Sequence, residues 1–193
     1  MTHRRRVLLF VPLGLVAVLL SGCCVSVTEP LSDPDKAEQD KRLEGKWENG
    51  AIIVIDSPAV KGYPKGLMRA VYQATADPPP EKAVFWFFTT TIGKDTYATV
   101  YTNADFREEG AFEKWKKGDR RYEICRYKLD EEKLTIHFGD DNATKKLMQA
   151  EKIEDAGSYF KTPPGWLAKY LEKNGPETLY DGTYKAEWVR AKK

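Results

Sequence analysis

A succession of short apolar runs constrains the fold of this chain most strongly. The runs are rich in β-branched and aromatic residues and are bounded by Gly, Pro, Asp or Asn, which is the pattern of antiparallel strands. In the clearest pair, residues 121–129 and 133–138 flank an acidic turn, and Leu134, Ile136 and Phe138 share one face. Further strands are predicted at residues 52–55, 67–75, 84–92, 96–101 and 184–189. Roughly seven or eight short strands in about 150 residues favour an antiparallel barrel or sandwich.

Three short helices are predicted around these strands. The first spans residues 35–43, because Asp33 is a suitable N-cap, Pro34 suits the first helical position and Gly45 ends the helix. The others span residues 141–152 and 164–173, and both precede the last predicted strand.

The N-terminus has the features of a secretory signal. Arginines at residues 4–6 precede an apolar run at residues 7–20, which is shorter than the ~20 residues that cross a bilayer. Leu20-Ser21-Gly22-Cys23 resembles the processing box of bacterial lipoproteins, in which the peptide is cut before the cysteine and the cysteine is acylated. The predicted organisation is a signal peptide at 1–22, a lipidated Cys23 with a tether and short helix at 23–40, and a barrel domain at 41–193.

This resemblance implies a location at the cell envelope, with the membrane reached through the N-terminal lipid. Cys24, and not Asp, follows the lipidated position, which favours the outer membrane and its periplasmic face over the inner membrane. Cys24 and Cys125 are the two other cysteines. A disulfide between them is possible in an oxidising compartment, but the strand position of Cys125 favours two separate thiols.

The charge balance excludes a strong positive electrostatic field of the kind that attracts nucleic acid. Without the three arginines of the signal peptide, the 31 basic residues fall to 28 against 29 acidic ones. Two His and three Cys are too few for a zinc module or a disulfide-dense scaffold. No nucleic-acid partner, metal or cofactor is predicted.

The opening of the predicted barrel resembles that of the lipocalins. A short helix leads to Gly45-Lys46-Trp47, and Arg190 follows the last strand. In lipocalins the Trp plugs the closed end of an up-and-down barrel, and an Arg from the final strand lies across its ring. The resemblance therefore assigns structural roles to Gly45, Trp47 and Arg190, and implies a lipocalin-like barrel. Together with the strand and helix patterns, it predicts a mainly β, lipocalin-like antiparallel barrel with a short N-terminal helix and two short helices before the last strand.

Most of the chain is similar to small bacterial lipoproteins with a lipocalin-like (calycin-type) domain. Residues 20–23, 43–47, 126–129 and 134–136 carry this similarity. It implies a fold and a location but no activity. The chain departs from lipocalins in having two short helices where they have one long helix.

Five aromatic residues are candidates for lining a ligand cavity in the barrel, and core packing explains them equally well. They are Tyr72, Phe85, Phe87, Tyr97 and Tyr101. Both faces of the aromatic strand at residues 84–92 need a cover, unless one of them lines a cavity.

Catalytic signals are weak, and no catalytic residue is assigned. Alternation places His137 on the face opposite Leu134 and Ile136, and no metal ligand stands at a suitable spacing. The acidic pair Asp140-Asp141 suits a helix start better than acid–base work. The basic stretch at residues 114–121 has two interpretations, contact with anionic headgroups or a solvated loop, and the loop is favoured.

The sequence therefore predicts a membrane-anchored envelope protein that binds a small apolar ligand or a protein partner and is not an enzyme. One alternative is an envelope scaffold or assembly factor with a filled barrel that acts through its surface. The other is an enzyme whose site is assembled in space, with His137 or a buried carboxyl group of perturbed pKa in a pocket.

Overall fold

In a computed structural model, the chain is described at residues 24–59, 62–74, 82–102, 104, 106, 111–118 and 120–192. The predicted signal peptide and Cys23 lie outside the described residues.

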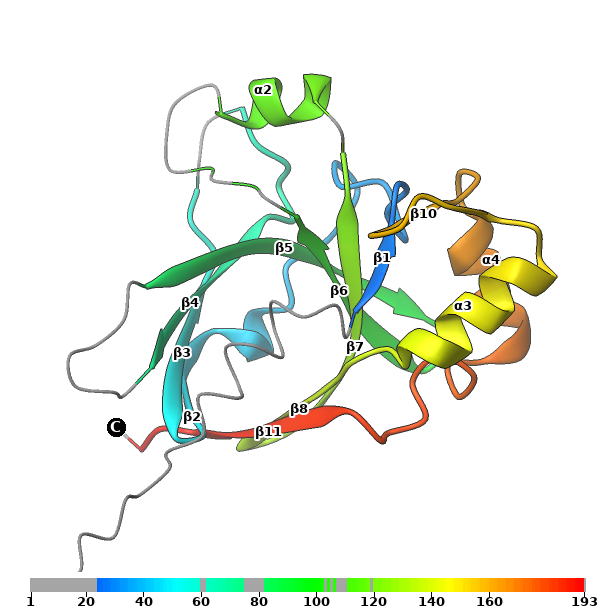
Figure 1. Ribbon diagram of the computed structural model, residues 1–193. Coiled ribbons are helices and arrows are strands. Elements are labelled where there is room, and N and C mark those ends of the chain that lie inside the picture. Colours follow the sequence, from blue (N-terminus) through cyan, green and yellow to red (C-terminus); the bar gives the residue numbers. More distant parts are fainter. Residues whose placement is uncertain are drawn as a thin grey trace, which may run out of the picture.

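Eight antiparallel strands close into a barrel (Figure 1). Seven of them follow one another along the chain and pair in that order, and β11 closes the ring by pairing with both β8 and β2. The strands are β2 (Gly45–Glu48), β3 (Ala51–Asp56), β4 (Met68–Ala74), β5 (Ala83–Ile92), β6 (Asp95–Tyr101), β7 (Tyr122–Asp130), β8 (Lys133–His137) and β11 (Lys185–Arg190). The prediction of a mainly β antiparallel barrel with a few short helices is confirmed.

Strand β7 is longer than its partner β8, and a further strand uses the free part of its edge. β8 pairs with residues 126–130 of β7, whereas β1 (Val25–Val27) pairs with residues 122–124. β10 (Phe160–Lys161) lies parallel to β1, and β9 (Glu154–Asp155) pairs with β10. Figure 1 shows β1 in blue between β7 and β10.

Much of the segment predicted as a tether packs against the barrel. Val25 and Val27 are fully buried, and Leu31 is nearly so. The alternation of Val25-Ser26-Val27 was the signal for this strand, which the sequence analysis missed. The barrel unit therefore includes residues on the N-terminal side of the predicted boundary at residue 41.

The two helices predicted before the last strand are confirmed as α3 (Asp141–Ala150) and α4 (Trp166–Asn174). Asp140 accepts a hydrogen bond from the Ala143 N–H at 2.6 Å, so this acid caps α3, as expected for a helix start. Helix α2 (Ala111–Lys117) occupies part of the basic stretch for which a loop was favoured.

The predicted N-terminal helix at residues 35–43 is wrong in length and type. Only a single 3₁₀ turn, η1 (Lys41–Leu43), is present there. Tertiary contacts hold this segment instead: the Glu38 carbonyl accepts from Thr89 Oγ1 at 2.9 Å, and the side-chain Nε2 of Gln39 donates to the Leu67 carbonyl at 3.0 Å. The Arg42 N–H donates to the Asp40 side chain instead of a backbone carbonyl.

Buried side chains form two separate groups. We call the group inside the barrel, which includes Trp47, Phe87 and Trp188, the inner cluster. We call the group outside it the outer cluster. It joins the outward face of β5, β6 and β7 to side chains from β1, α2, α3 and α4, and it includes Phe88 and Tyr101. Both faces of the aromatic strand are thus covered, as the sequence required.

Candidate functional site

The barrel interior holds a cavity of about 120 Å³ that is partly open to solvent. Its walls are almost entirely apolar. The lining residues that carry a polar group are Cys24, Cys125, Glu123 and Tyr127. The apolar lining residues are Leu43, Ile53, Ile55, Ala70, Phe85, Phe87, Ala98, Val100, Leu134, Ile136 and Phe138.

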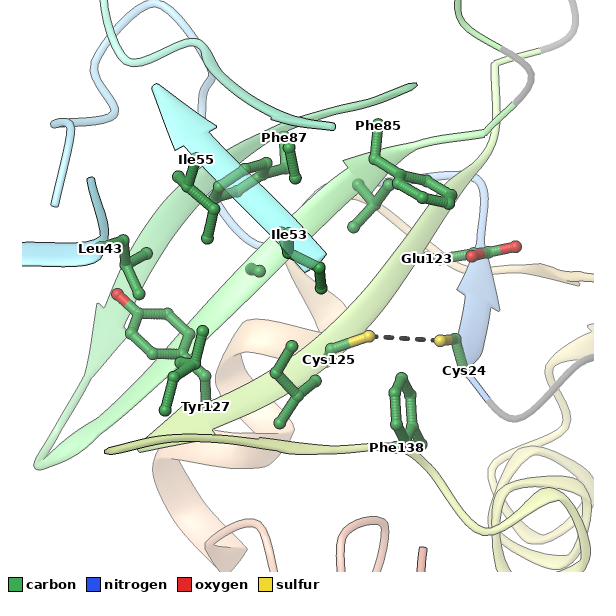
Figure 2. A pocket seen from close by; sticks show the side chains of 15 residues that line it. Cys24, Leu43, Ile53, Ile55, Phe85, Phe87, Glu123, Cys125, Tyr127 and Phe138 are labelled. Atoms are coloured by element: carbon green, nitrogen blue, oxygen red, sulfur yellow. Dashed lines mark hydrogen bonds between the residues drawn. The ribbon is translucent and has the colours of Figure 1, made fainter. Parts of the chain in front are cut away.

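The two ends of the cavity differ in exposure (Figure 2). Leu43 and Tyr127 lie at one end and are buried, whereas Phe85, Glu123 and Cys24 lie at the other end and are only partly buried. The cavity therefore opens near Glu123.

Strand alternation explains which side chains reach the cavity. On β7, Glu123, Cys125 and Tyr127 face inward, while Ile124 belongs to the outer cluster. The space itself arises where β4 and β6 place small residues inward, at Ala70 and Ala98. A larger side chain at either position would occupy part of the cavity.

The closed end is built around Trp47, which is fully buried. Its indole Nε1 donates to the Leu43 carbonyl at 2.8 Å, which holds η1 over the end of the barrel. The guanidinium carbon of Arg190 lies 4.2 Å from the centre of the Trp47 ring. This is the contact that the resemblance implied.

Arg190 also ties the closed end together through hydrogen bonds. Nη1 donates to the Glu44 carbonyl at 2.8 Å and Nη2 donates to the Arg42 carbonyl at 2.6 Å. Gly45 has a φ of +133°, and a Cβ there would lie 2.8 Å from Arg190 Nη1. Only glycine suits this position without strain or displacement of the arginine.

The hydroxyl group of Tyr127 is hydrogen-bonded to a carboxyl group behind the closed end of the barrel. The hydroxyl donates to Asp40 Oδ2 at 2.9 Å, and burial raises the pKa of this tyrosine well above its usual value. Hydrogen bonding to the Arg42 guanidinium lowers the pKa of Asp40. Tyr127 is therefore a fixed, neutral wall of the cavity at physiological pH.

Among the described residues that line the cavity, Glu123 alone carries a carboxyl group. Burial against apolar side chains raises its pKa, because the charged form loses hydration there. A protonated Glu123 can both donate and accept a hydrogen bond. The sequence analysis did not single out this residue, although its position in the β7 alternation was visible.

The five predicted ligand-lining residues divide between the two clusters. Phe85 and Phe87 line the cavity, as predicted. Tyr72 belongs to the inner cluster but does not line the cavity; its ring packs edge-on against Trp188 at 6.4 Å. Tyr97 and Tyr101 correct the prediction, because they face outward and belong to the outer cluster. Their inward neighbours on β6 are Ala98 and Val100.

His137 also lies away from the cavity, as its alternation predicted. It pairs in register with Arg126 on β7 and Lys185 on β11. Burial lowers its pKa, and nearby positive charges, led by Arg126, lower it further. His137 is therefore not placed to act on a molecule in the barrel.

The described residues offer neither a metal-binding group nor a membrane-spanning helix. Within that part of the chain, no three His, Cys, Asp or Glu side chains are grouped in a way that would hold a metal ion. None of the helices described there has the length and apolar character needed to cross a membrane.

Comparison of the chain with protein-family models, with curated protein sequences and with solved structures finds no match. The class of protein is thus defined by the fold and the site alone. It is a closed, eight-stranded antiparallel β-barrel with an apolar interior cavity that opens at one end.

Proposed function

We propose that this protein binds a small apolar ligand, without catalysis, inside the barrel. The observation that carries the proposal is the cavity, which has almost entirely apolar walls and four lining residues with a polar group, Cys24, Glu123, Cys125 and Tyr127. Apolar pockets with a few placed polar groups are the usual form of small-molecule sites. Transfer of an apolar group from water to such walls supplies the affinity, and the carboxyl group of Glu123 orients a polar end at the opening.

The volume limits what can enter. A dry cavity of roughly 150 Å³ lined by aliphatic and aromatic residues takes up benzene. The cavity here, at about 120 Å³, suits one ring or a short alkyl segment. A longer ligand would leave its remaining length at the opening.

The surface gives less support to a role as a scaffold. Among the described residues, the large hydrophobic side chains that are clearly exposed are Val54, Tyr184 and Val189. Contact surfaces for proteins commonly present a larger continuous apolar patch.

A homologous series of n-alkanols, from hexanol to dodecanol, tests the proposal by titration calorimetry of the purified full chain. We expect affinity to rise about four-fold per methylene, because each buried CH₂ contributes about 0.8 kcal/mol, until the cavity is full. Beyond that chain length, each further methylene should add less affinity.

Matched variants locate the binding. Ala98→Leu fills part of the cavity and is expected to weaken octanol binding at least ten-fold, and Ala70→Leu provides a second test if the first variant folds poorly. Ala150→Leu makes the same change on an exposed helix position and is expected to bind as the parent does. Binding that is absent from the parent, or equal in all variants, would refute the proposal.

We further propose that lipid on Cys23 holds the protein at the cell envelope, at the periplasmic face of the outer membrane. The lipoprotein-like processing box supports this. Cys24, one peptide bond from the proposed anchor, lies at the open end of the cavity, so the opening would face the bilayer. Metabolic labelling with an alkyne fatty acid, followed by membrane fractionation, tests it. Label should be lost in Cys23→Ser and kept in Cys24→Ser, and label in both variants would contradict the assignment.

A further inference from the structure

We infer that Cys24 and Cys125 form a redox site, in which a disulfide fastens β1 to the barrel wall. Their Sγ atoms lie 3.2 Å apart, in contact but without a covalent bond (Figure 2). The residues are 101 positions apart in the sequence, so the fold alone brings them together. The sequence analysis favoured two separate thiols because Cys125 lies within a predicted strand, and the contact between the two sulfurs corrects that interpretation.

The backbone places the two residues opposite each other. Val25 pairs with Ile124 and Ser26 pairs with Glu123 in antiparallel register, so the register continued by one residue sets Cys24 against Cys125. Opposed Cα atoms in such a pair are about 4.5–5.5 Å apart. This range lies within the roughly 4.4–6.8 Å that disulfides span. Both thiols also point into the same cavity, so the sulfurs meet without a change of face.

The two thiols differ in access, which sets the order of reaction. Cys24 is partly exposed at the cavity opening, whereas Cys125 is buried. An external disulfide, carried by a thiol–disulfide oxidoreductase or by glutathione, therefore meets Cys24 first.

The exchange proceeds in two displacements. The Cys24 thiolate attacks one sulfur of the external disulfide, whose S–S bond breaks to release one thiolate. The Cys125 thiolate then attacks Cys24 Sγ, and the second external thiolate leaves. The two protons lost by Cys24 and Cys125 end on the two released thiols. Two cysteines are oxidised, and one external disulfide is reduced.

The disulfide would constrain a large part of the barrel. The loop that it closes contains β2, β3, β4, β5 and β6 entirely. Cross-links that close loops of this length restrict the unfolded chain strongly. β1, which otherwise pairs with β7 at three positions and with β10 at one, would be fixed at the cavity opening.

Oxidation of the purified full-length Cys23→Ser variant by oxidised glutathione tests the inference. With Cys23 removed, two cysteines remain. We expect both thiols to disappear, with a mass decrease of about 2 Da and a rise in Tm of roughly 10 °C that dithiothreitol reverses. Trypsin should then release residues 122–126 joined to the peptide that contains Cys24.

Two further variants make the result decisive. In the Cys23→Ser background, Cys125→Ser should stop at a glutathione adduct on Cys24, and Cys24→Ser should leave the buried Cys125 unmodified. Persistence of both thiols in the parent, or an adduct on Cys24 that Cys125 never displaces, would overturn the inference. Amide exchange of Val25 and Val27 gives an independent measure, and should slow at least ten-fold on oxidation. Unchanged exchange would show that the bond does not fasten β1.

Discussion

The inner and outer clusters lie on opposite faces of β5, β6 and β7 and are packed differently. On β5, Phe87 faces the inner cluster and borders the cavity, while Phe88 faces the outer cluster and contacts Tyr101 with ring centres 5.6 Å apart. The outer cluster is rich in aromatic contacts, and Trp115 packs against both Tyr101 and Tyr122. The comparison indicates that side chains in the outer cluster contribute more to the stability of the fold. Side chains in the inner cluster make fewer contacts, because a cavity lies beside them.

The first prediction compares these two adjacent phenylalanines. Phe88→Ala is expected to lower the free energy of unfolding by about 4 kcal/mol, because it removes a full set of contacts. Phe87→Ala should cost only about 2 kcal/mol, because one side of that ring already lacks neighbours. Urea unfolding of both variants measures the difference. Equal losses would mean that the inner cluster is as tightly packed as the outer one.

The second prediction concerns buried charge on the outward face of β7. Arg126 and Asp95 form an ion pair with side chains only 9% and 11% exposed. Asp95→Ala should cost about 3 kcal/mol, because it leaves the guanidinium group buried and uncompensated. The control is Asp56→Ala, which breaks the more exposed pair with Arg69 and should cost less than about 1 kcal/mol. Chemical denaturation distinguishes the two, and similar losses would contradict the role of burial.

The third prediction tests the closed end of the inner cluster. Arg190→Lys keeps the charge but loses the planar group that stacks on Trp47 and reaches the Glu44 and Arg42 carbonyls. We expect a loss of about 1–2 kcal/mol in the free energy of unfolding. Lys185→Met, at an exposed position on the same strand, should change stability by less than about 0.5 kcal/mol. If both changes have the same effect, Arg190 does not hold the closed end.

The smallest expected effect comes from Glu123, the carboxyl group in the inner cluster. Its pKa is raised by burial in the folded state, so between its unfolded and folded pKa values the unfolded chain binds fewer protons. The free energy of unfolding therefore falls as pH rises through this window and stays lowered above it. Glu123→Gln should raise Tm by about 2 °C at pH 7 and have no effect near pH 3. A stabilisation of the same size at both values would exclude the ionisation of Glu123 as its cause.

Much of the barrel was predictable because strand signals are local. The hairpin predicted at residues 121–129 and 133–138 corresponds to β7 and β8 within one residue at each end, and the predicted 184–189 strand corresponds to β11. The helix at residues 35–43 failed for a non-local reason. The Asp33-Pro34 start forms a turn, but Thr89 then binds the Glu38 carbonyl and Leu67 binds the Gln39 side chain, so the segment is held by distant residues and not by helical bonds.

The site was less predictable, because alternation separates two faces without saying which one is inside. Both faces of β5 and β6 are apolar, so Tyr97 and Tyr101 were as reasonable as Ala98 for the cavity. Elements far from β6 in the sequence, α4 and β1 among them, pack on the face that carries Tyr97 and Tyr101. Their packing makes this face the outer one and leaves Ala98 inside the barrel. The contact between Cys24 and Cys125 depends likewise on a three-residue strand that only tertiary structure stabilises.

The closing role of β11 has a consequence for synthesis of the chain. Translation produces seven barrel strands in order and then 47 residues between His137 and Lys185 before the eighth strand begins. Until β11 emerges, β2 and β8 present unpaired edges, and Trp47 lacks the cation that covers it. A nascent or interrupted chain that stops short of residue 185 therefore lacks the strand that pairs with both β2 and β8, and unpaired strand edges of this kind favour association between chains.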